Sequence, residues 1–166
     1  MRRAAIAGPL AGTCLLFTLS AGCIGENEAV VFVDPSIEGP AATVASSALG
    51  TSLSGSFHLS LVLGPRASGS SQVSLIQFSV TSSDESTVIV PSLGVTASRA
   101  LPVTVAPDSE VGVDFTFDTG ATLLPTDTKT ALCASPGIKI TGTVQDSLQD
   151  GATPVASAVF QPGGCM

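Results

Sequence analysis

The segment Val111–Asp118 reads Val-Gly-Val-Asp-Phe-Thr-Phe-Asp and alternates strictly between apolar positions and positions that are polar or glycine. Successive side chains of a β-strand point to opposite faces of a sheet, so this period of two predicts a strand with one buried face. We therefore expect Val111, Val113, Phe115 and Phe117 to lie in a hydrophobic core.

A second alternating strand is predicted upstream, where Phe57, Leu59 and Leu61 share one face and the run ends at Gly64-Pro65. We expect these three residues in the same core. In the run 73–80 the apolar residues change from one face to the other part of the way along. Such a change of phase predicts a β-bulge or a strand that moves between sheets.

Shorter apolar runs of strand length complete the pattern, at residues 30–33, 88–90, 101–105, 138–144 and 155–160. Turn residues separate them, and proline lies between the expected strands. Only residues 41–49 could form a helical turn or two. About eight short strands without long helices predict an all-β fold, an antiparallel β-sandwich of the immunoglobulin-like kind, with a jelly roll as the alternative.

Composition restricts the partners that this domain can have. The seven aromatic residues are all Phe, and the absence of Trp and Tyr argues against surfaces that stack on sugars or single-stranded nucleic acid. The formal net charge is −7. Arg2 and Arg3 belong to an N-terminal segment that we expect to be removed. Without them, 4 of the 6 basic residues stand against 13 acidic ones, a net charge of −9. Because such a balance repels phosphate, we expect no nucleic-acid partner.

The N-terminus has the pattern of an export signal. Arg2 and Arg3 are followed by no charged residue between positions 4 and 22, and small residues end the segment. A permanent transmembrane helix would need about 20 strongly apolar residues, and Gly8 and Pro9 interrupt this run.

The end of this segment, Leu19-Ser20-Ala21-Gly22-Cys23, resembles the lipobox of bacterial lipoproteins, except that Ser20 occupies the usual aliphatic position. The resemblance implies a lipoprotein signal peptide at 1–22, a lipidated tether at 23–29 and a β-sandwich domain at 30–166. Cys23 would carry the lipid and bind the membrane. Ile24 in place of Asp resembles lipoproteins passed on to the outer membrane. Ordinary signal cleavage after Gly22 is the alternative.

Four cysteines are present, and their positions separate them. Cys14 leaves with the signal and Cys23 takes the lipid, so Cys133 and Cys165 remain in an oxidising compartment, where we expect a disulfide. The alternative is a reactive thiol. One histidine and no C-x-x-C motif argue against a zinc site.

No motif in the chain predicts catalysis or a cofactor. His58, the only histidine, lies on the polar phase of its strand, and no G-x-S-x-G or phosphate-binding glycine motif occurs. Acids in expected turns, at 84–85, 108–110 and 146–150, fit no calcium motif. We therefore expect a non-enzymatic cell-envelope lipoprotein whose β-sandwich is structural or binds another envelope or surface protein. The alternative is a module for a small ligand or Ca²⁺.

Overall fold

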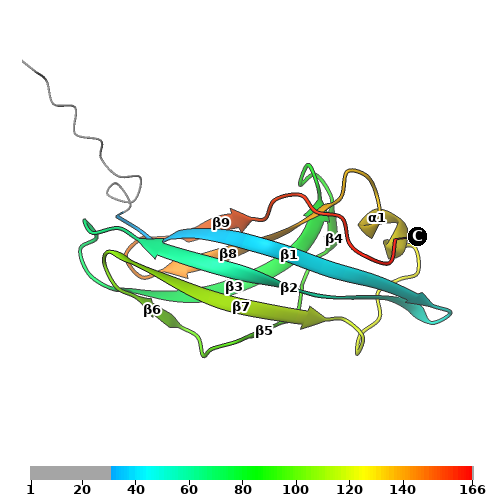
Figure 1. Ribbon diagram of the computed structural model, residues 1–166, viewed down its shortest axis with the longest axis horizontal. Coiled ribbons are helices and arrows are strands. Elements are labelled where there is room, and N and C mark those ends of the chain that lie inside the picture. Colours follow the sequence, from blue (N-terminus) through cyan, green and yellow to red (C-terminus); the bar gives the residue numbers. More distant parts are fainter. Residues whose placement is uncertain (1–30, 166) are drawn as a thin grey trace, which may run out of the picture.

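The computed structural model describes residues 31–165, which form nine strands and one short helix (Figure 1). The strands are β1 Asp34–Ser47, β2 Gly50–Leu63, β3 Ser71–Ser82, β4 Val88–Val90, β5 Val95–Ala97, β6 Val103–Val105, β7 Ser109–Asp118, β8 Ile138–Asp146 and β9 Ala152–Ala156. The helix α1 spans Thr128–Leu132. The sequence-based prediction of an all-β protein is confirmed.

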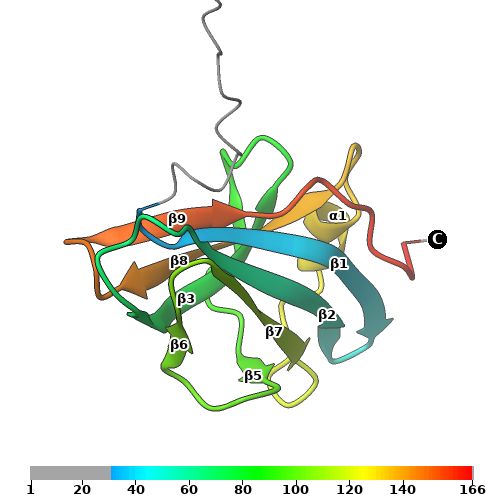
Figure 2. The same ribbon diagram turned by 60° about the vertical axis from the view of Figure 1, so that its left-hand side comes forward.

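Two antiparallel sheets pack face to face as a sandwich (Figure 2). The first has the strand order β1-β2-β7-β5, and the second has the order β4-β3-β8-β9, with β6 pairing to one end of β3. The two alternating strands that the sequence shows most clearly, β2 and β7, are neighbours. Their register places Phe57 opposite Phe115 and Leu59 opposite Val113, so the apolar faces of both strands are directed into the core together.

The centre of the core is aromatic. The Phe57 ring lies 5.1 Å from that of Phe115 and 4.8 Å from that of Phe78 in the opposite sheet. Six of the seven core residues predicted from the sequence are buried: Phe57, Leu59, Leu61, Val113, Phe115 and Phe117. Val111 is only half-buried, because it lies near the start of β7, where β5 no longer covers the edge.

The predicted change of phase in β3 is a bulge. The pairing of β3 with β8 shifts register between Leu75 and Gln77, where β3 has one extra residue. The extra residue reverses the faces, so that Val73 before it and Phe78 after it are both buried.

Strand β1 contradicts three expectations. The apolar run expected at 30–33 forms no strand over residues 31–33, and the strand begins after it, at Asp34. Residues 41–49, the one segment that could have formed a helical turn or two, are instead the end of β1 and the turn into β2. Pro35 and Pro40 lie inside the strand, which is possible because β1 is an edge strand and its register shifts between Glu38 and Ala41.

The chain after β9 joins the two sheets. Phe160 exchanges two backbone hydrogen bonds with Ile138 at the start of β8. Gly163 then pairs in parallel with β1, and Cys165 forms a disulfide with Cys133, just after α1. The Cα atoms of the two cysteines are 5.3 Å apart.

Candidate functional site

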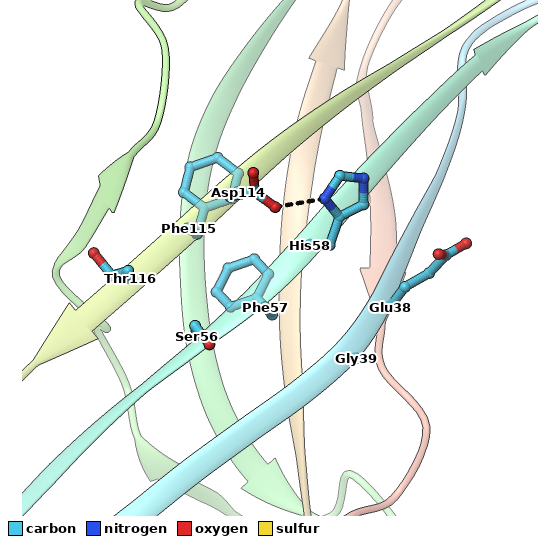
Figure 3. A pocket seen from close by; sticks show the side chains of 8 residues that line it. All are labelled: Glu38, Gly39, Ser56, Phe57, His58, Asp114, Phe115 and Thr116. Carbon is cyan, nitrogen blue, oxygen red and sulfur yellow. Dashed lines mark hydrogen bonds and ion pairs between the residues drawn. The ribbon is translucent and has the colours of Figure 1, made fainter.

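A hollow of about 480 Å³ lies on the outer face of the first sheet (Figure 3). Three adjacent strands line it, with Glu38 and Gly39 from β1, Ser56, Phe57 and His58 from β2, and Asp114, Phe115 and Thr116 from β7. The phenylalanines form only its floor, because their rings point into the core. The polar groups that a ligand would meet are hydroxyls, carboxylates and one imidazole.

His58 and Asp114 are brought together by the register of β2 and β7. The two residues are direct partners, and the backbone of Asp114 bonds outward to Ser98 and not to β2. In an antiparallel pair of this kind the side chains are at their closest. The result is a contact of 2.7 Å between His58 Nδ1 and Asp114 Oδ1.

Gly112 provides the space that the imidazole occupies. A Cβ atom at this position would lie 2.4 Å from both Cε1 and Nε2 of His58, so that edge of the ring occupies the space a side chain would need. The sequence pattern shows Gly112 only as a member of the outward-facing phase of β7. Its role depends on the strand opposite, which the sequence does not reveal.

His58 and Asp114 form a solvated acid–histidine pair on the outer face of the first sheet. The His58 side chain is 38% exposed and that of Asp114 is 74% exposed. Ser60, two residues along the same face of β2, donates its hydroxyl to Glu110 (2.7 Å). Glu38 extends away from the imidazole (Figure 3). Exposed ion pairs of this type stabilise a fold by about 0–1 kcal/mol, so the pair adds polarity to the hollow and little stability.

Asp146 differs most from the sequence-based interpretation, which took it as a solvated turn acid. It is fully buried at the end of β8. Its carboxylate accepts the backbone N–H of Val33 (2.7 Å), the backbone N–H of Leu148 (2.9 Å) and the hydroxyl of Ser71. A buried carboxylate needs such donors, because its charge is otherwise unfavourable away from water. Asp146 thus attaches the residues that precede β1 to the second sheet.

The Asp84-Glu85 turn behaves as expected for solvated acids. Hydroxyl groups of Ser82 and Ser86 hydrogen-bond to the Asp84 carboxylate, and these bonds, that from Ser82 first, lower the pKa of Asp84 from 3.8 to about 2. Glu85 forms an ion pair with Lys139 at 2.6 Å. Both acids have partners from the protein, so this turn is a closed hydrogen-bonded structure.

The remaining candidate residues can be placed only in part. Cys133 and Cys165 are joined, whereas Cys23 lies outside the described residues. Among residues 31–165, no three His, Cys, Asp or Glu side chains lie close enough together to hold a metal ion. No helix in the same range is long and apolar enough to cross a membrane.

Comparison of the chain with protein-family models, with curated proteins and with solved structures found no match.

Proposed function

We propose that the protein is a cell-envelope lipoprotein, anchored through Cys23 and directed to the outer membrane, whose β-sandwich binds another protein without catalysis. The observation that carries this proposal is the segment Leu19–Cys23 at the end of an uncharged export signal. Two or three acyl chains anchor a protein stably on a membrane, whereas one holds it only marginally.

The entry point of the chain supports a short connection to the membrane. Val33 is fixed by the buried carboxylate of Asp146. The ten residues from Cys23 to Val33 can span at most about 33–36 Å. The domain would therefore stay close to the membrane, with the Val33 end facing it.

The opposite end of the domain suits a protein partner. Strand β1 has 14 residues and is about 46 Å long, so it carries the β1–β2 turn to the far end of the molecule (Figure 1). Residues 39–57 and 119–126, which meet at that end, contain no charged residue. Leu49 is 86% exposed at the turn and Leu123 is 39% exposed beside it. Two neighbouring exposed leucines in an uncharged surface support an interaction site at this end.

The strand order supports an immunoglobulin-like connectivity. In such domains one sheet has the order A-B-E-D and the other contains C, F and G. The sheets β1-β2-β7-β5 and β9-β8-β3-β4 follow that order, with β6 as an additional short strand on β3 in the second sheet. Domains with this architecture commonly bind proteins at their loop ends, although architecture alone does not determine function.

Metabolic labelling with a fatty-acid analogue tests the anchor. The native chain is expected to be labelled and to require detergent for extraction, and Cys23→Ser is expected to lose the label. Cys14→Ser is the matched control, because this cysteine lies inside the predicted signal and its loss should leave labelling unchanged. Absence of label on the native chain in a lipoprotein-processing host would contradict the proposal.

A photo-crosslinking residue at position 49 tests the interaction surface. We expect a discrete crosslinked partner from position 49 and none from Thr104, an exposed position on β6. Crosslinking from Thr104 alone would show that the partner binds elsewhere.

The alternative function, small-ligand binding, is favoured only by the hollow beside His58, whose volume falls in the range of about 300–1,000 Å³ seen for ligand sites.

A further inference from the structure

The last residues of the chain lie along the edge of β1 and occupy the place of another strand. We call residues 161–165 the C-terminal strap. Gly163 donates its N–H to the carbonyl of Ala42 (2.8 Å) and accepts the N–H of Val44 (2.9 Å), in parallel pairing. The strap thus satisfies backbone groups of β1 that point away from β2.

The approach of the strap to β1 is close enough to require glycine. Gly164 has φ +78°, a conformation that side chains disfavour, and a Cβ atom there would lie 2.1 Å from the carbonyl oxygen of Val44. Gly164 therefore lets this part of the chain lie directly on the strand. A freely moving tail would have no need of this fit.

Few noncovalent contacts hold the strap on β1. Gln161, Gly163 and Gly164 are exposed, and Pro162 alone is buried. The strap is held by the two backbone hydrogen bonds of Gly163, by the packing of Pro162 and Cys165, and by the disulfide from Cys165 to Cys133. Both cysteines are partly exposed, and both also pack against the core.

We propose that the strap is a redox-released cover for the edge of β1, with the Cys133–Cys165 disulfide as its latch. An uncovered edge strand offers free N–H and C=O groups that pair with strands of other chains, and covering it prevents this. When the disulfide is reduced, the strap detaches and the groups of Ala42 and Val44 become available. The proposal does not depend on the lipid anchor or on the partner at Leu49.

The opening reaction is thiol–disulfide exchange with a dithiol reductant. A thiolate of the reductant attacks one sulfur of the disulfide, forms a mixed disulfide and releases the other cysteine as a thiolate, which takes up a proton. The second thiol of the reductant then displaces the first cysteine. Two electrons pass from the dithiol to the protein, which is left with two thiols while the reductant becomes a disulfide.

Hydrogen exchange of single amides in the exported full chain tests the proposal, because the Val44 N–H has its partner in the strap. Reduction with a dithiol is expected to speed exchange at Val44 by at least about tenfold. The amide of Val113, which pairs with Leu59 in the middle of the same sheet, should not change. Alkylation and mass spectrometry before and after reduction verify the state of the two cysteines.

Two variants separate the latch from the strap. Cys133→Ser/Cys165→Ser keeps the strap without the link, and a chain ending at Phe160 lacks both; each should show fast exchange at Val44 without added reductant. Unchanged exchange at Val44 after reduction would overturn the proposal, because noncovalent contacts would then suffice. Loss of protection at Val113 together with Val44 would also overturn it, since the disulfide would then stabilise the whole sandwich. Reaction of both cysteines with an alkylating agent before reduction would also overturn the proposal, because the disulfide would then be absent.

Discussion

Truncation of Phe115 to alanine tests the assignment of the core. Phe115 is fully buried, with its ring 5.1 Å from that of Phe57 and 5.5 Å from that of Phe78. Phe→Ala substitutions in cores cost about 3–5 kcal/mol through lost burial and the cavity that remains. Aromatic pairs contribute about 0.5–1.5 kcal/mol each beyond their buried area. Because Phe115 takes part in two such pairs, we expect a cost of about 4–5 kcal/mol in the free energy of unfolding.

This loss is large compared with the stability expected for one domain, about 5–15 kcal/mol. It corresponds to a fall of roughly 12–20 °C in the melting temperature for a domain of this size. Urea unfolding and thermal melts followed by circular dichroism measure both quantities. Thr116→Ala is the matched control, because Thr116 is the next residue on β7 and faces solvent, so we expect a change within about 1 kcal/mol. Equal melting temperatures for the two variants would refute the assignment of faces on β7.

Three further predictions concern single positions. Gly142→Ala should cost about 1–3 kcal/mol in urea unfolding, because the new methyl group meets a core phenyl ring, whereas Gly112→Ala meets a half-exposed imidazole and should cost less; the reverse order would contradict this. The Asp84 carboxyl should titrate by NMR with a pKa of about 2, below the unfolded value of 3.8. Its contribution to the free energy of unfolding is therefore fully present above pH 3.8 and is lost as the pH falls towards 2. A titration midpoint near 3.8 would contradict this prediction. Asp146→Asn should cost about 2–4 kcal/mol and speed exchange of the Val33 amide, because that N–H loses its charged acceptor; an unaltered rate at Val33 would contradict the assignment.

The strands that the sequence predicts well are those that bury one continuous face. Residues 57–63 and 111–118 show the period of two because their inward positions fill the core. Strand β1 shows no such period, since only Ile37 and Val44 are buried along its length. It is formed by backbone pairing with β2 over most of its residues, and this pairing leaves no signature in side-chain polarity. The failure to predict it is therefore a property of edge strands with few apolar residues.

The candidate site likewise combines features that the pattern of one strand predicts with features that depend on pairing between strands. The exposure of His58 could be predicted from its phase in β2, but its contact with Asp114 depends on the register between two strands that are distant in sequence. The burial of Asp146 could have been recognised. In β8 the inward positions are 138, 140, 142 and 144, and Asp146 continues that series by one step. A carboxylate on the buried phase at the end of a strand indicates that donors from elsewhere in the chain will meet it.

These attachments explain how β1 can hold its position with so few buried side chains. Just before its start, Val33 is bound by the carboxylate of Asp146 from the second sheet, and towards its end Val44 is bound by the C-terminal strap. Both are polar contacts made from outside the first sheet. If Cys23 carries a lipid, any pull on the anchor reaches the domain first at Val33 and passes into β8 through Asp146. Asp146 would then hold the start of β1 against that pull. The edge of β1 near its other end is covered by the C-terminal strap, which reduction of the disulfide would release.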